Sequence, residues 1–172
     1  QKEKLNTPHQ TDGSTAVLCY VDHATHAVYT AALGDTEARL YRPLEDRTMR
    51  TIPLSCVRNW SSPKDAIRAA AAKNNPEIAN IWPKKNAKSL RVQGLNVSRS
   101  LGDGHNTAVS SKPKITVNQV RPGDCVVVAC DGLWDFVFDH EVSRIVENGG
   151  DGGSLTDYAI YGAKGLDNTS VI

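Results

Sequence analysis

The sequence has little of what would mark it as a nucleic-acid-binding, membrane or secreted protein. Its 172 residues carry a formal net charge of +1, which gives no electrostatic reason to bind nucleic acid or an anionic membrane. No hydrophobic run approaches the length of a membrane span, and residues 1–20 lack the charged start and apolar stretch of a signal segment. Aromatic residues make up only 6% of the chain, so aliphatic side chains must form most of the core of one domain, or most of one.

The cysteines give no sign of a zinc site or of a disulfide framework. None of the four forms a Cys-x-x-Cys pair, and a disulfide framework would be unusual at this chain length and spacing. Three of them lie in or beside apolar runs, where we expect them to be small buried residues. We therefore predict a reducing, intracellular setting, cytoplasmic or nuclear. The four residues are Cys19, Cys56, Cys125 and Cys130.

The order of strand-like and helix-like segments predicts an α+β fold with antiparallel sheets. The first strands form a meander, because residues 22–25 suit a short hairpin loop and Gly34-Asp35 a tight turn. Ser154 and Asp157 have capping-box spacing, which predicts a helix that starts there. Strands are predicted over 14–21, 26–33, 38–41, 49–54, 90–97, 114–120 and 125–130, helices over 62–73, 139–147 and 154–163, and a loop over 76–89.

Two carboxylates near the end of the chain carry the strongest functional signal. Residues 126–130 form an apolar, β-branched run that stops at Asp131-Gly132, and Asp167 stands before a short β-rich tail. A carboxylate at a strand end is held by rigid backbone while it lies half outside the core. Such a position suits Mg²⁺ or Mn²⁺, which prefer oxygen ligands. Either aspartate alone could equally be a turn former.

Five segments, in order along the chain, resemble signatures of the metal-dependent (2C-type) Ser/Thr protein phosphatases of the PPM family. Ala-Cys-Asp-Gly-Leu-Trp-Asp and Asp-Asn-Thr-Ser-Val-Ile match most closely. A third has Asn96 where the family pattern Leu-Ala-Val-Ser-Arg-x-Leu-Gly-Asp has Ala, and a fourth varies the Gly-Asp-Ser-Arg turn before Arg39. One such match is weak, but five in the family's order are specific. The segments are residues 13–16, 32–39, 95–103, 129–135 and 167–172.

The resemblance implies a fold, a reaction and a set of metal ligands. The fold is two stacked antiparallel β-sheets flanked by helices, an α/β/β/α sandwich. The reaction is hydrolysis of phosphoserine and phosphothreonine in phosphoprotein substrates by water that two or more Mg²⁺ or Mn²⁺ ions activate. Asp131 and Asp167 correspond to ligands of the main metal cluster, and Asp35 and Asp135 to ligands, with Asp131, of a further and weaker site. The alternatives are a turn former for Asp35 and a helix cap or surface charge for Asp135.

The chain lacks the two blocks with which the family's sequences begin. One carries an Arg and acidic residues, and the other is Asp-Gly-His-Gly-Gly, whose Asp bridges two metal ions. Asp12-Gly13 and Gly102-Asp103-Gly104-His105 do not replace them, because each belongs to another motif. We therefore expect a polar segment over 1–12 and the C-terminal two-thirds of a phosphatase-like domain over 13–172, incomplete at its N-terminus.

Without those blocks, no catalytic residue is identifiable in this chain. An N-terminal fragment or partner chain would have to complete the sheets and the site. The alternative is a catalytically dead pseudophosphatase that acts as a binding or regulatory module. Trp134 is expected to pack in the core, and Ser98 and Arg99 to be structural. The five histidines show no metal-ligand spacing.

Overall fold

The computed structural model describes residues 12–60, 91, 95–104, 106 and 108–172. The predicted helix over 62–73, the predicted loop over 76–89, nearly all of the polar N-terminal segment and His105 lie outside the described residues. Of the predicted strand over 90–97, the structure describes residues 91 and 95–97, and these include isolated bridge positions, such as Val97 opposite Asn59, rather than a strand.

One antiparallel sheet has the strand order β2-β3-β7. The hairpin between its first two strands is closed by Asp22, whose carboxylate accepts hydrogen bonds from the Ala24 N–H at 2.9 Å and the Thr25 hydroxyl at 2.7 Å. An Asx turn of this kind is a common reason for Asp at the end of a strand. The predicted hairpin is confirmed here, but the meander does not continue through the Gly34-Asp35 turn, because the strand after that turn pairs in the other sheet and the third strand of this sheet comes from residues 114–119. The strands are β2 (Ala16–Asp22), β3 (Ala27–Leu33) and β7 (Lys114–Gln119).

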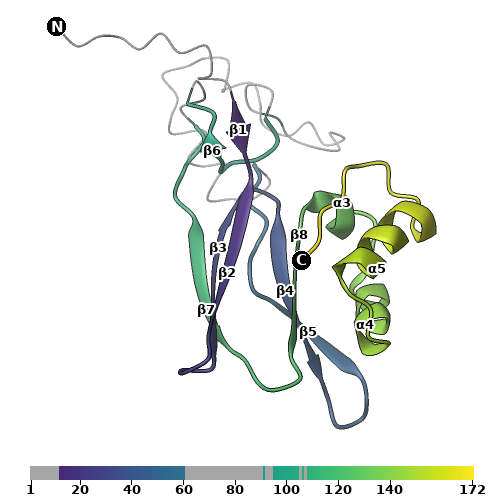
Figure 1. Ribbon diagram of the computed structural model, residues 1–172. Helices are drawn as coiled ribbons and strands as arrows, with labels where there is room; N and C mark the ends of the chain where they lie inside the picture. Colours follow the sequence, from purple (N-terminus) through teal and green to yellow (C-terminus); the bar gives the residue numbers. More distant parts are fainter. Residues whose placement is uncertain (1–11, 61–90, 92–94, 105, 107) are drawn as a thin grey trace, which may run out of the picture.

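The second antiparallel sheet has the order β5-β4-β8 and stacks on the first, as Figure 1 shows. A cluster buried between the two sheets contains Val28 from the first sheet, Leu40 from the second, and Leu54, which directly follows a strand of the second. Val17 and Val126 pack against this cluster. The strands are β4 (Glu37–Pro43), β5 (Met49–Pro53) and β8 (Cys125–Ala129). The stacked antiparallel sheets confirm the predicted α+β class.

The described helices pack on the outer face of the β5-β4-β8 sheet (Figure 1). Leu133, Val142 and Leu155 from the helices meet Tyr41 and Val127 from the sheet in a second buried cluster. In the described part of the chain, no helix is long and apolar enough to span a membrane. The helices are α3 (Asp131–Trp134), α4 (Asp139–Glu147), α5 (Gly152–Asp157) and the π-helical turn η1 (Tyr158–Gly162).

The outer face of the β2-β3-β7 sheet carries large apolar side chains that the described residues leave exposed. Tyr20, Tyr29 and Val117 form one row across the three strands, and Leu18 and Ile115 flank Ala31 in the next row. Leu18, Tyr20 and Ile115 are more than 60% exposed. We call these five exposed residues (Leu18, Tyr20, Tyr29, Ile115 and Val117) the bare sheet face. The described helices therefore cover one of the two sheets.

The last helix starts two residues before its predicted position. Asp151 is its N-cap: the Asp151 carboxylate accepts a hydrogen bond from the Ser154 N–H at 2.9 Å, and Ser154 occupies the N3 position of the capping box. The prediction of a box that starts at Ser154 was wrong, because a charged acceptor three residues earlier caps the positive end of the helix.

We expect the substitution Asp151→Ala to lower the free energy of unfolding by about 1 kcal/mol, the usual cost of losing an N-cap. Chemical denaturation of the full-length protein that carries this chain measures the loss. Asp157→Ala is the matched control, since Asp157 completed the box that the sequence predicted. A larger loss for Asp157→Ala than for Asp151→Ala would contradict the observed cap.

Candidate metal centre

The four predicted metal ligands lie on three chain segments next to strand ends. Asp35 follows β3 in the turn to β4, Asp131 opens α3 directly after β8, and Asp135 is the C-cap of that helix. Asp167 lies in the loop before Val171, which forms an isolated β-bridge with Ala129 at the end of β8. Asp35 and Asp131 therefore follow strand ends, as the sequence pattern predicted, whereas Asp135 ends a helix and Asp167 lies in a loop.

The segments around Asp131 and Asp167 are in direct contact. A Cβ on Gly132 would lie 2.2 Å from the carbonyl oxygen of Asn168, so only glycine permits this approach. The Thr169 hydroxyl donates to the Gly132 carbonyl at 3.2 Å. Cys130 also joins the two segments: its thiol donates to the Asn168 carbonyl at 3.2 Å and its N–H donates to the Ser170 carbonyl at 3.3 Å. The last two family signatures thus lie side by side, while the ligand role of their aspartates stays a prediction.

The carboxylates share a common electrostatic field. Burial raises the pKa of Asp35 above its ordinary value, and the charge of Asp131 raises it further. The pKa of Asp135 is raised as well, first by burial and then by the charges of Asp131 and Asp167. Like charges held in a partly buried place destabilise one another, and a divalent cation would relieve that repulsion. Carboxylate oxygens are also the donors that Mg²⁺ and Mn²⁺ prefer, so the chemistry of the donors fits these ions.

The aspartates have the right chemical type of donor atom, but their positions do not form a complete metal site. Within the ranges that the structure describes, no three His, Cys, Asp or Glu side chains converge on a point that could hold a metal ion. The ligand roles of the four aspartates therefore stay a prediction, and the described residues do not form a complete metal site.

A cavity of about 640 Å³ opens beside Asp35 and Asp131. Asp103, on its wall, is only 5% exposed and accepts a hydrogen bond from the Ser100 hydroxyl at 2.6 Å. A Cβ on Gly13 would lie 1.9 Å from an Asp103 carboxylate oxygen, because β1 (Gly13–Ser14) pairs with β6 (Leu101–Gly102). Asp103 thus lies where two of the family segments meet at the cavity. The other lining residues are Asp12, Ser14, Thr15, Leu95, Asn96 and Val97.

Two contacts at this end of the molecule were missed by the sequence reasoning. Asn96 donates a side-chain hydrogen bond to Asp35, which acts against the rise of that pKa. The signal was available, since Asn96 stands where the family pattern has alanine. Trp134 packs as expected, but its indole N–H is also shared between the carbonyls of Ala129, at 3.0 Å, and Glu37, at 3.3 Å.

The Val-Ser-Arg segment makes hydrogen bonds to backbone carbonyls, which agrees with the structural role expected for it. Ser98 is fully buried and its N–H donates to the Arg58 carbonyl at 2.9 Å. Arg99 donates from its guanidinium to the Lys112 carbonyl at 2.6 Å. The cysteines differ from expectation: Cys19, Cys125 and Cys130 are half-buried rather than buried, and all four thiols are free.

Comparison with known proteins agrees with this fold. The family model described as "Protein phosphatase 2C" matches residues 1–159. A rice protein named probable protein phosphatase 2C 49 is 33% identical over 148 residues, which cover 83% of this chain and 32% of that protein. The Arabidopsis thaliana probable protein phosphatase 2C 61 is 30% identical over 145 residues, which cover 78% of this chain and 42% of that protein.

Solved structures show the same fold. A Caenorhabditis elegans sex determining protein superimposes with a TM-score of 0.73 at 25% identity, over 94% of this chain and 40% of that one. The serine-threonine phosphatase 2C of Toxoplasma gondii gives a TM-score of 0.68 at 16% identity, over 92% of this chain and 55% of that one. The stacked sheets and the match to the family model indicate a 2C-type phosphatase domain. The chain belongs to the protein phosphatase 2C family, which is generally Mg²⁺- or Mn²⁺-dependent, and it spans less than half the length of these curated relatives.

Proposed function

We propose that this chain forms the C-terminal part of the catalytic domain of a protein Ser/Thr phosphatase. Asp131 and Asp167 hold the main metal cluster, and Asp35 and Asp135 contribute to a further site beside it. The observation that carries the proposal is the close contact of Gly132 with Asn168, which brings the segments of Asp131 and Asp167 together. The charge of Asp131 also raises the pKa of Asp35 and Asp135, after the larger effect of burial. A phosphatase has a use for these carboxylates because they can hold the divalent cations that neutralise the negative charge of the phosphoryl group.

The metal ions and the residues of the chain would have different roles in the reaction. Bound Mg²⁺ or Mn²⁺ would neutralise the phosphoryl oxygens and activate water for attack on phosphoserine or phosphothreonine. The chain's own residues orient the carboxylates: Asp131 follows the end of β8 by two residues, the Gly132–Asn168 contact brings the Asp167 segment alongside, and Asn96 donates to Asp35.

A further polypeptide segment or partner chain completes the domain in this proposal. Two observations support it: the described donors do not close a metal site, and the bare sheet face leaves an apolar layer exposed. The additional segment would bring the bridging carboxylate and the general acid that the family resemblance implies. We place the protein inside the cell, in the cytoplasm or nucleus.

A pseudophosphatase is the second candidate, and the incomplete donor set favours it. Such a protein would keep the fold and serve as a binding or regulatory module for phosphoproteins. The two candidates differ in one measurable property, which is Mn²⁺-dependent release of phosphate.

The test is hydrolysis of a phosphothreonine peptide by the full-length protein that carries this chain, with Mn²⁺ and with a chelator. We expect hydrolysis to require the ion. Asp131→Asn should reduce it by at least a hundredfold, because even supporting residues around metal ligands are worth about 10–100-fold. Asp157→Asn, on α5, is the control and should retain the activity. Mn²⁺ binding without hydrolysis would support the pseudophosphatase, and hydrolysis that survives chelation or Asp131→Asn would overturn both.

A further inference from the structure

We propose that Arg39 is a positioning residue for the carboxylates of α3. It acts through Trp134, whose indole it holds against the sheet, and so fixes the helical turn that presents Asp131 and Asp135. The inference rests on the proposed function in one respect, that these carboxylates bind metal ions.

Arg39 is held in a partly buried place between three partners. Its guanidinium carbon lies 4.0 Å from the centre of the Trp134 ring, within cation–π range. One terminal nitrogen donates to Glu37 at 3.0 Å and the other to Asp139 at 2.9 Å. The Arg39 and Glu37 side chains are only 18% and 13% exposed, so this pair is less screened by water than an ordinary surface ion pair, whereas Asp139 is 47% exposed.

The guanidinium joins three elements of the fold. Glu37 and Arg39 lie on the same face of β4, since side chains two residues apart on a strand point to the same side. Asp139 is the first residue of α4, and the Tyr41 hydroxyl also donates to its carboxylate, at 2.8 Å. Trp134 is the last residue of α3. A planar guanidinium can serve all three partners at once because its donors form a fixed fork.

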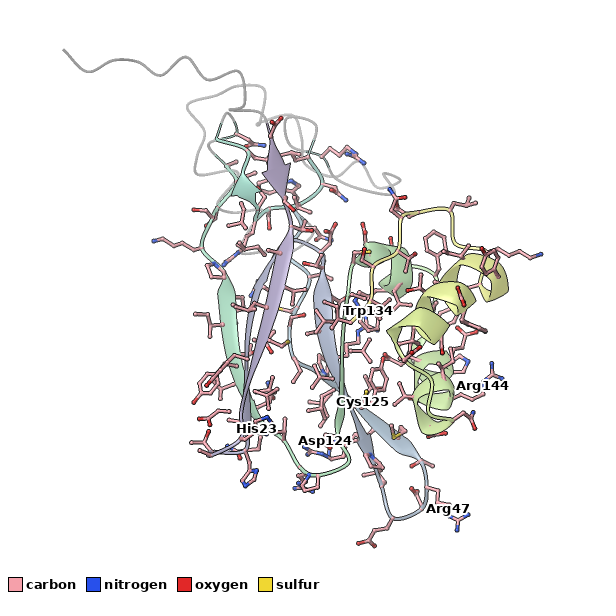
Figure 2. The ribbon with its side chains drawn as sticks, in the orientation of Figure 1. His23, Arg47, Asp124, Cys125, Trp134 and Arg144 are labelled. Atoms are coloured by element: carbon pink, nitrogen blue, oxygen red, sulfur yellow. The ribbon has the colours of Figure 1, made fainter. Side chains whose placement is uncertain are left out.

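Trp134 in turn governs the orientation of α3. Its N–H is fixed by the carbonyls of Ala129 and Glu37, and Arg39 lies over its ring, so both the edge and the face of the indole are held. Figure 2 shows Trp134 between the β5-β4-β8 sheet and the helices. No side chain caps the start of α3, and a single helical turn is not stable without tertiary contacts.

The carboxylates that the turn carries are four residues apart. Residues at i and i+4 lie on one face of a helix, and the Asp135 N–H donates to the Asp131 carbonyl at 2.8 Å. A rotation of α3 would therefore move both carboxylates together. Metal ligation tolerates only small displacements, on the order of 0.5 Å, so a loosened Trp134 would weaken the site without any ligand being removed.

Arg39→Ala in the full-length protein tests this positioning role. We expect Mn²⁺ binding, followed by titration calorimetry, to weaken by about 10–100-fold, the usual effect of residues that orient metal ligands. In the metal-free protein, hydrogen exchange at the Trp134 indole N–H should become faster, as seen in ¹H–¹⁵N spectra assigned with Trp134→Phe. Arg39→Lys should restore only part of both properties, because an ammonium group cannot keep the two-sided fork.

Arg42→Ala is the matched control on the same strand. Arg42 pairs with Asp124 at 2.7 Å, and Asp124 lies at the other end of the sheet from α3 (Figure 2). This variant should lose stability but keep the Mn²⁺ affinity and the indole exchange rate of the parent protein.

Equal effects of Arg39→Ala and Arg42→Ala on both readouts would show that Arg39 is merely structural and would overturn the inference. A parent protein that binds no Mn²⁺ would overturn the proposed metal site instead. The indole exchange would then still decide whether Arg39 fixes Trp134.

Discussion

The substitution Gly132→Ala should destabilise the protein by about 1–3 kcal/mol, the usual cost of forcing an extra methyl group into a packed site. It should also weaken Mn²⁺ binding sharply. The added methyl carbon would meet the Asn168 carbonyl at 2.2 Å, and that neighbour is backbone, which cannot rotate away as a side chain would. Relief of the clash must displace the segment that carries Asp167 from the turn that carries Asp131.

Chemical denaturation and Mn²⁺ titration of the full-length protein measure the two effects. Gly104→Ala is the control, since a Cβ at Gly104 would meet nothing within 4 Å. A Gly132→Ala protein that binds Mn²⁺ as tightly as the parent would show that the contact between the two segments has no part in the metal centre.

Residues 1–172 expressed alone should not behave as a soluble monomer. The bare sheet face presents Leu18, Tyr20 and Ile115 at more than 60% exposure, in adjacent rows of one sheet. Contiguous apolar surface of this kind drives association, and unpaired strand edges template it. Size-exclusion chromatography with light scattering should therefore find self-associated chains.

Charge placed on the bare sheet face should reduce that association. The double variant Leu18→Lys/Ile115→Lys alters both side chains that flank Ala31, whereas Leu44→Lys alters an exposed leucine in the hairpin between β4 and β5. Only the double variant should shift the chain toward smaller species. A monomeric parent chain with a cooperative melt would contradict the prediction.

The elements that the sequence predicted are those with local signals. The hairpin of β2 and β3 follows from two β-rich runs around Asp22, and α4 matches its predicted bounds because its apolar face repeats with helical spacing. The start of α5 was predicted wrongly because two possible capping boxes overlap in the sequence. Only the structure shows that Asp151, and not Ser154, is the N-cap. The motifs placed Asp131 and Asp167 at strand ends, but spacing along the chain does not give the separation of two carboxylates.

The sequence could not predict contacts between distant parts of the chain. Arg39 and Trp134 are separated by nearly a hundred positions, and nothing in either local pattern indicates that one covers the other. The exposure of the bare sheet face could not be predicted from the sequence either. Leu18 and Tyr20 look like core residues in a strand, and a strand that is apolar on both faces indicates a sheet covered on both sides. The described residues provide the cover for only one of those sides.

Anomalous scattering from crystals of the full-length protein grown with Mn²⁺ tests the central claim most directly. The account predicts manganese peaks at about 2.1 Å from carboxylate oxygens of Asp131, in a cluster that Asp167 also reaches. Manganese found only at other sites, or carboxylates of Asp131 and Asp167 more than about 8 Å apart and so too far to share a metal cluster, would contradict it.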